Sequence, residues 1–281
     1  MKIAITSDSV IDLTKELLEK YDIKTIPFTF LLGDEDYKDG DITTAEIFEY
    51  VNKTGVLPKT SAVNEVQFTE FFTEVLKEYD AIIHFDISSE MSTTCNNAIN
   101  AAKNFDGKVE IVDSRALSTG VALLAIYARK LTQTESDIKV IAEKVRKRTS
   151  DLQVSFVIER LDFLHKGGRC SSLQLLGANI LKVRPKIAVK DGKMGMAGSY
   201  RGPMPAVITK YCKDVIAENP NPDKSVVFIT YSSATPEMLK AAHEAVDGLG
   251  FENVYETFAG ATVSSHCGPN TLGILYINDA E

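Results

Sequence analysis

AIIHFDISSEMSTTCNNAINAAKNFDGKVEIV (residues 81–112) places a strand, a helix and a second strand in one continuous segment. Residues 81–87 and 109–112 are apolar runs of strand length, and residues 92–104 between them are expected to form a helix. A helix that joins two strands in this way returns the chain to the same end of the sheet, so the strands pair in parallel. The segment therefore predicts an α/β fold with a mainly parallel sheet.

The same alternation extends on both sides of this segment through the first half of the chain. Capping boxes at Thr43–x–x–Glu46 and Asn64–x–x–Gln67 mark the starts of two helices. The other expected elements are strands at 2–6 and 23–32 and helices at 13–21, 43–53, 64–79, 118–132 and 136–149. We predict that residues 1–150 form a Rossmann-like α/β/α domain.

After residue 150 the pattern changes, because strands become more frequent than helices. Lys190–Asp191–Gly192–Lys193 is a hairpin turn, in which Asp-Gly supplies the positive φ angles. The expected strands are 152–158, 183–189, 193–200, 226–231, 254–258 and 272–277, and the expected helices are 161–167, 172–180, 203–218 and 235–248. We predict a second domain at residues 151–281, of α+β class with a mixed sheet.

Length and composition exclude several functional classes. A chain of 281 residues is long enough for two domains, and its net charge of −8 argues against broad nucleic-acid binding. The four cysteines include no CxxC pair, so neither a metal site nor a redox motif is predicted. The longest apolar run is eight residues, too short for a transmembrane segment, and no signal peptide is apparent. We expect a cytoplasmic protein with free thiols.

The first half contains three hydroxyl-rich clusters, each of which follows a predicted strand or precedes a predicted helix. They are residues 6–9 (TSDS), Thr60–Ser61, and residues 88–94 (SSEMSTT). Ligands of open α/β sheets bind at the carboxyl ends of the strands, where backbone N–H groups of the following helices favour an anion. Capping alone would explain any one cluster, since Ser and Thr are preferred N-cap residues. Together they predict an anion site.

The second half contributes two further candidates. Arg201 follows the strand at 193–200, and the guanidinium group is well shaped to bind a carboxylate, although a lone Arg there is usually a surface charge. His266 lies in a segment expected to be a Gly/Pro loop before the last strand, residues 265–270. His84, inside an apolar strand, is expected to be a core residue.

Enzymatic alternatives have weaker support in the sequence. The sequence contains no GxSxG, Walker A or GxGxxG motif. Ser92 and His266 could serve as nucleophile and base of a hydrolase or acyltransferase, but no orienting acid can be assigned from the sequence. The residues alone predict an anion-binding α/β protein.

Ordered motifs along the whole chain allow a more specific hypothesis. They are residues 5–9 (ITSDS), 58–61 (PKTS), 87–94 (ISSEMSTT), 112–115 (VDSR), 161–169 (LDFLHKGGR) and 266–269 (HCGP). In these segments the sequence resembles the DegV family, which includes the fatty-acid-binding B subunits of bacterial fatty-acid kinases. It departs from the family pattern at Thr93, where a Gly is common, at Cys95, where an aromatic residue is common, and at Asn270, where a Gly often follows Gly-Pro.

The resemblance implies a non-catalytic lipid-binding protein with a long-chain fatty acid held between its two domains. Thr60, Ser61 and Ser92 would bind the carboxylate from the first domain, and His266 and Arg201 would approach it from the second. Thr93 and Gly268, next to these residues, complete the candidate set. The resemblance also implies a partner, a separate ATP-dependent kinase subunit that phosphorylates the bound carboxylate for phospholipid synthesis, and no cofactor.

Overall fold

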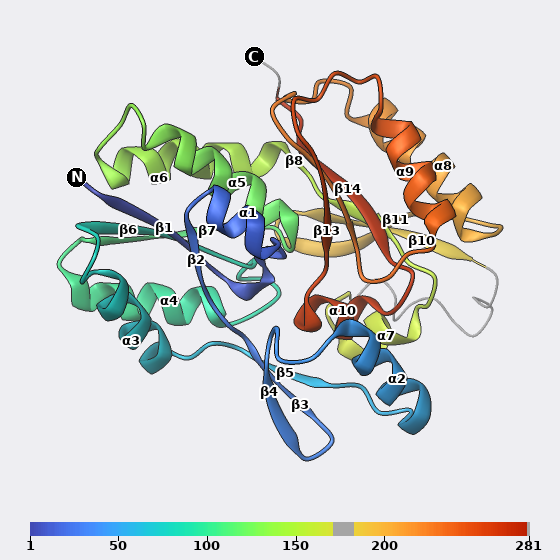
Figure 1. The fold of residues 1–281 in the computed structure, drawn as a ribbon, viewed down its shortest axis with the longest axis horizontal. Coiled ribbons are helices and arrows are strands. Elements are labelled where there is room, and N and C mark those ends of the chain that lie inside the picture. Colours follow the sequence, from blue (N-terminus) through green and yellow to red (C-terminus); the bar gives the residue numbers. More distant parts are fainter. Residues whose placement is uncertain (171–182, 280–281) are drawn as a thin grey trace.

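The computed structural model describes residues 1–170 and 183–279. The predicted helix at 172–180 lies outside the described residues. Within the described part, a parallel sheet and a mixed sheet pack side by side, and a small third sheet lies below them in Figure 1. The α/β class with a parallel N-terminal sheet and a mixed C-terminal sheet is therefore confirmed. The domain boundary at residue 150 stays a prediction.

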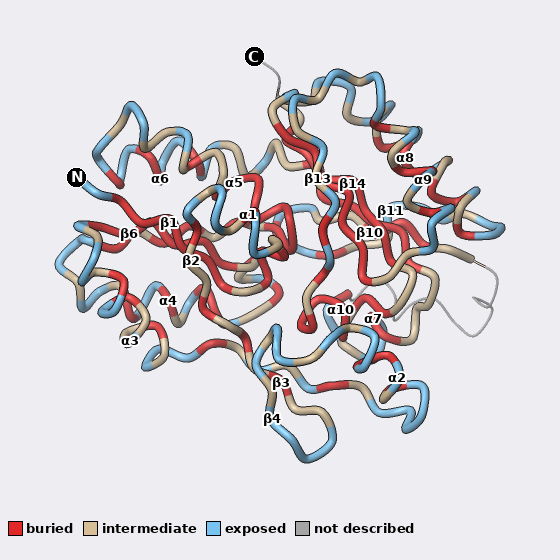
Figure 2. Tube along the Cα trace, in the orientation of Figure 1, coloured by how far each residue is buried: buried red, intermediate tan, exposed pale blue. Residues whose placement is uncertain are grey.

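The first sheet contains four parallel strands in the order β2-β1-β6-β7. Their bounds are β1 Ile3–Asp8, β2 Ile23–Ile26, β6 Ala81–Asp86 and β7 Val109–Asp113. One face is covered by α3 (Glu65–Val75) and α4 (Thr94–Ala102), and the other by α1 (Lys15–Lys20), α5 (Thr119–Leu131) and α6 (Ile138–Lys147). Figure 2 shows the resulting buried strands and the exposed outer surfaces of these helices.

Alternation along the strands explains the two faces. Residues Ala4 and Ile82 pack with the aromatic side chains of α3, whereas Ile5 and Ile83 pack under α5 and α6. Strands buried on both faces have nearly continuous apolar sequences, and β6 follows this pattern apart from His84 and Asp86, which are also buried. Both predicted capping boxes are present, at the N-terminus of α2 (Thr44–Thr54) and at that of α3.

The second sheet has seven strands in the order β11-β10-β9-β14-β12-β13, with β8 also paired to β14. Among the described strands of this sheet, only β12 and β13 pair in parallel. The strands are β8 Leu152–Gln153, β9 Ser155–Val157, β10 Arg184–Lys190, β11 Lys193–Tyr200, β12 Val227–Tyr231, β13 Val254–Phe258 and β14 Leu272–Ile277. Helices α8 (Met204–Glu218) and α9 (Pro236–Val246) cover one face. The opposite face packs on the first half, through residues such as Phe156 and Phe228.

Three sequence predictions need correction. The single strand expected at 23–32 is two strands in different sheets, because Pro27 fixes its own φ and lacks an N–H donor. Its second part, β3 (Thr29–Leu32), joins β4 (Glu35–Lys38) and β5 (Lys59–Ser61) in the small antiparallel sheet. The strand expected at 152–158 is divided into β8 and β9. Residues 265–267, expected in a loop, form the last turn of α10 (Ala261–Cys267), so the loop begins at Gly268.

Helix α10 begins against two carboxylates from the first half of the chain. The backbone N–H of Gly260 donates to Asp12 (2.8 Å), and that of Ala261 donates to Asp39 (2.7 Å). The Ser118 hydroxyl donates to the other oxygen of Asp12. These contacts satisfy amide groups that a helix start otherwise leaves unpaired. A helix of the second half is thereby oriented by the first.

We expect Asp12→Ala to lower the free energy of unfolding by about 2–4 kcal/mol, because it leaves the Gly260 N–H and the Ser118 hydroxyl without their acceptor. Urea denaturation of both proteins measures the difference. Asp34→Ala, at an exposed position before β4, is the control and should change stability by less than about 0.5 kcal/mol. Equal stability of Asp12→Ala and the unaltered protein would contradict the proposed role of this contact.

Candidate functional site

A cavity of about 460 Å³ lies between the two halves of the chain. This volume is within the range of small-molecule sites, about 300–1,000 Å³. The first half supplies Phe28, Thr60, Ala62, Ile87, Ser89, Glu90, Met91, Ser92, Thr93 and Leu117, and the second half supplies Arg169, Met194, Thr262, Val263, His266 and Cys267. The exposed surface of the cavity lining is mostly apolar, although half of the lining residues, Glu90 and Arg169 included, are polar or charged.

Thr60 and His266 form the polar contact that bridges the two halves at the cavity. Thr60 Oγ1 lies 3.0 Å from His266 Nε2, at hydrogen-bond distance. Thr60 is on β5, and His266 is in the last turn of α10. The two residues are 206 positions apart in the sequence, so only the packing of α10 beside the small sheet brings them together.

Two glycines allow α10 and His266 to adopt this position. A Cβ atom on Gly167, at the end of α7 (Asp162–Gly167), would lie 2.4 Å from His266 Nδ1. Gly268 ends α10 with a φ of 75°, and a Cβ there would lie 2.7 Å from the Phe163 ring. Gly268 therefore shapes the end of α10 rather than lining the cavity.

Burial and, to a smaller extent, the nearby positive charge of Arg169 together lower the pKa of His266 to about 4. The imidazole is accordingly neutral at pH 7, with one N–H to donate. Its Nδ1 is buried without a hydrogen-bond partner among the described residues and faces Gly167. A neutral imidazole can donate one hydrogen bond to Thr60 without placing an unpaired charge in the cavity.

Ser92 and Thr93 lie just before α4 and line the same cavity as Thr60 and His266. Ser92 Oγ is 2.8 Å from Thr94 Oγ1 and accepts a hydrogen bond from the Thr94 N–H (3.3 Å). Thr93 is exposed and makes no capping hydrogen bond. Ser92, the residue before the N-cap Thr93, therefore accepts from the first helical N–H, and both residues line the cavity.

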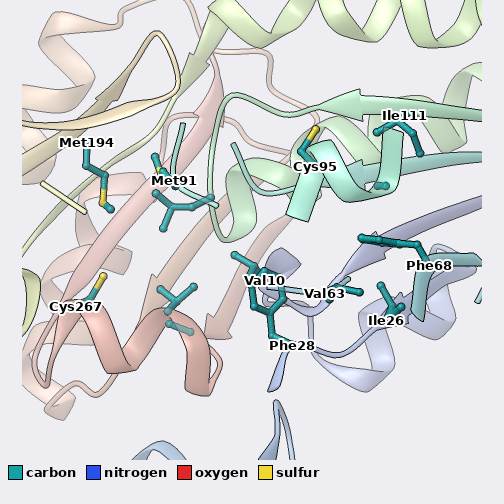
Figure 3. Packing of buried hydrophobic residues seen from close by; sticks show 14 of the residues in the cluster. Val10, Ile26, Phe28, Val63, Phe68, Met91, Cys95, Ile111, Met194 and Cys267 are labelled. Carbon is teal, nitrogen blue, oxygen red and sulfur yellow. The ribbon is translucent and has the colours of Figure 1, made fainter. Parts of the chain in front are cut away.

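The apolar wall comes from several separate segments. Figure 3 shows Met91, Met194 and Cys267 on three such segments, with Phe28 on a fourth. Met side chains adapt to ligands of varied shape because they are unbranched and flexible. The arrangement offers a hydrophobic site for an extended apolar group beside a small polar site.

The whole length of the chain matches one family model. Residues 2–279 match the model described as an uncharacterised protein of the DegV family. The chain belongs to the DegV family.

Relatives of this DegV chain are similar over their full lengths. A DegV domain-containing protein of Caldanaerobacter subterraneus is 27% identical over 278 residues, with 98% of both chains covered. A fatty acid-binding protein of Thermotoga maritima is 28% identical over 290 residues, covering 97% of this chain and 96% of that protein. The solved structure of a fatty-acid-binding DegV family protein from Thermus thermophilus superposes with a TM-score of 0.91 at 27% identity, covering 99% of this chain and 100% of the other.

The structure brings only some of the predicted site residues of this DegV chain together. Thr60, Ser92, Thr93 and His266 line the same cavity. Ser61 is exposed on β5, because neighbouring strand residues point to opposite faces. Arg201 is exposed after β11 and is not among the cavity-lining residues. The binding roles of all these residues, Gly268 included, stay predictions.

Sequence reasoning did not assign a site role to Arg169 or Thr262, which also line the cavity. Arg169 is an exposed residue whose guanidinium donates to the Gly167 carbonyl (2.7 Å). It was visible in the sequence as part of the motif at 161–169, but nothing there indicated that it would lie near His266. Thr262 was hidden because α10 was not predicted.

The alternative of a Ser/His catalytic pair is not supported by the contacts of the described residues. The hydrogen-bond partner of His266 is Thr60, and that of Ser92 is Thr94. No acid orients His266 Nδ1 within the described part of the chain. A general base needs contact with its nucleophile and an orienting partner, so the geometry favours binding over hydrolysis.

The described residues also contain no cluster that could hold a metal ion and no helix able to span a bilayer.

The depressed pKa of His266 predicts a specific pH dependence of stability in the ligand-free protein. The imidazole protonates at about 6.5 when unfolded and about 4 when folded, so between these values the unfolded state binds more protons. The contribution of His266 is therefore complete above pH 6.5 and is lost as the pH falls towards 4.

We expect this loss to be on the order of 1–3 kcal/mol, and absent in His266→Gln. The measurement is the free energy of unfolding of both proteins between pH 4 and 7. Taking the difference between them cancels the titration of the buried carboxylates. Parallel curves for the two proteins would show that the His266 pKa is not depressed.

Proposed function

We propose that this protein binds a long-chain fatty acid in the cavity, with the carboxylate at Thr60 and His266 and the acyl chain along the apolar wall. The observation that carries the proposal is the Thr60–His266 contact at the edge of a mostly apolar cavity between the two halves. Relatives described as fatty-acid-binding, from Thermotoga maritima and Thermus thermophilus, support the ligand class.

The polar groups suit a carboxylate better than a neutral head group. In the tautomer with the proton on Nε2, His266 donates to Thr60 Oγ1 and leaves the Thr60 hydroxyl hydrogen free to donate to the ligand. Ser92 and Thr93 offer further hydroxyl donors, and Arg169 adds a positive charge at the same cavity, whereas the carboxylate of Glu90, which also lines it, is paired with Lys193 and Arg115. A carboxylate has about four acceptor positions, which this set of donors can fill.

The acyl chain supplies most of the binding free energy. Burying each methylene contributes roughly 0.8 kcal/mol, so about ten buried methylenes contribute roughly 8 kcal/mol. A buried carboxylate without partners would cost several kcal/mol. The hydroxyls and His266 therefore act mainly by removing this cost and by fixing the orientation of the ligand.

We further propose that the bound acid is presented to a separate ATP-dependent kinase subunit in the cytoplasm. That subunit would transfer the γ-phosphoryl group of ATP to a carboxylate oxygen, giving an acyl phosphate and ADP. The absence of a Walker A or GxGxxG motif from the sequence supports this division of labour, as does the family resemblance. In this proposal the chain is the lipid-binding component and not the catalyst.

We expect native mass spectrometry of the purified protein to show a bound fatty acid. Thr60→Val keeps the side-chain shape but removes the hydroxyl, and should weaken fatty-acid binding at least about 10-fold, since hydrogen bonds to a charged group contribute about 1.5–3 kcal/mol. Thr73→Val, at an exposed position on α3, is the matched control and should bind normally.

A second measurement addresses the kinase. Hydroxylamine should trap an acyl hydroxamate from protein, fatty acid and ATP only when a fatty-acid kinase subunit is added. Protein that is always empty and is not stabilised by added fatty acid would refute the proposed ligand. Ester hydrolysis by the chain alone that disappears in Ser92→Ala would instead support the hydrolase alternative.

A further inference from the structure

We propose that the tip of the β10–β11 hairpin positions the Ser92 loop, residues 88–93, for recognition of the ligand's head group, with Gly192 and Ser88 as the positioning residues. The inference rests on the proposed function, because it assigns these two residues a role in the same site. Neither residue is among those that line the cavity.

The hairpin tip is held against the Ser92 loop by several contacts between the two halves. The Ser88 hydroxyl donates to the Gly192 carbonyl (2.7 Å), and Ser88 is fully buried. Lys193 Nζ lies 3.2 Å from a Glu90 carboxylate oxygen. The Arg115 guanidinium donates to the Asp191 carbonyl and lies 3.8 Å from Glu90. The exposed ion pairs contribute little individually, so the buried Ser88–Gly192 hydrogen bond is the central contact.

Ser88 connects this contact to Ser92 through the backbone. Its carbonyl accepts hydrogen bonds from the N–H of Met91 (2.9 Å) and that of Ser92 (3.2 Å). Its own N–H donates to the Ala116 carbonyl (2.8 Å). Gly192 in the second half is therefore linked to the Ser92 backbone through one intermediate residue. A shift of the hairpin tip would move Ser88 and, with it, the hydroxyl of Ser92.

Close packing constrains position 192 more strongly than the turn alone. The turn places Asp191 and Gly192 at φ values of 52° and 79°, as a two-residue hairpin requires. A Cβ atom at position 192 would also lie 2.6 Å from Ser88 Oγ and 3.0 Å from the Arg115 guanidinium. At Gly248, which has a similar φ of 77°, a Cβ atom would meet nothing within 4 Å. Backbone strain is common to both glycines, but the clash with the Ser92 loop is specific to Gly192.

The test compares Gly192→Ala and Ser88→Ala with Gly248→Ala, which imposes a similar backbone strain elsewhere. Affinities for hexadecanoic acid and hexadecan-1-ol are measured by competition with a fluorescent fatty acid. The two ligands share the acyl chain and differ in the head group. We expect both hairpin-contact variants to lose on the order of 10-fold in affinity for the acid and less than about 2-fold for the alcohol, because charge-assisted hydrogen bonds depend on donor position. Gly248→Ala should leave the acid-to-alcohol ratio unchanged.

Amide hydrogen exchange of the ligand-free protein gives an independent reading. We expect the Met91 and Ser92 amides to exchange faster in Gly192→Ala and Ser88→Ala than in Gly248→Ala. Unchanged exchange at these two amides, or an unchanged acid-to-alcohol ratio in folded variants, would overturn the positioning role. Failure of the unaltered protein to bind either ligand would refute the proposed function instead, and the exchange data would still decide the positioning role.

Discussion

The cavity depends on the contact between the start of α10 and the carboxylates of Asp12 and Asp39. Both acids belong to the first half, and both accept hydrogen bonds from backbone amides at the α10 N-terminus. The contact is costly, because burial raises the pKa of Asp12 well above its ordinary value, and burial also raises that of Asp39. The hydrogen bonds from Ser118 and Gly260 to Asp12 oppose that rise. Hydrogen bonds have defined distances and directions, so these contacts specify the position of α10 more narrowly than non-directional apolar packing would.

The position and orientation of α10 in turn determine which of its side chains reach the cavity and contact residues of the first half. With its first turn held by two acids and its end closed by Gly268, the helix presents His266 to Thr60 and Val263 and Cys267 to the apolar part of the cavity. Val263 and Cys267 are four residues apart and so lie on one face of the helix. One short helix therefore contributes both to the polar site and to the apolar wall, and the relative placement of the two is fixed by its backbone.

The sheets could be predicted from the sequence more successfully than the site, because strands and helix starts are marked by neighbouring residues, whereas the site is assembled by contacts between residues far apart in the sequence. Apolar runs and capping boxes are local, and the segments at 81–112, 43–46 and 64–67 were correctly interpreted. Helix α10 was missed because its sequence, ATVSSHC, is rich in β-branched residues and serine, and its start is stabilised by acids more than 200 positions away. Arg169 could not be preferred to Arg201 from sequence, since both follow ordinary element ends and only the fold places one at the cavity. His84, expected in the core, is fully buried, with Nδ1 2.7 Å from the Thr6 hydroxyl.

The two halves are joined by apolar packing that surrounds the polar groups of the cavity, and this arrangement suits the amphipathic ligand that we propose. One apolar cluster includes Ala4 and Phe72 from the first half and Phe156 and Met194 from the second, so the halves share a core. Beside this shared core, the hydroxyls of Thr60 and Ser92 and the imidazole of His266 line the cavity. An apolar ligand alone would gain nothing from these groups, and a small anion alone would gain little from the apolar wall. A molecule with both parts would satisfy the hydroxyls while it extends the core, and the ligand that we propose has both parts.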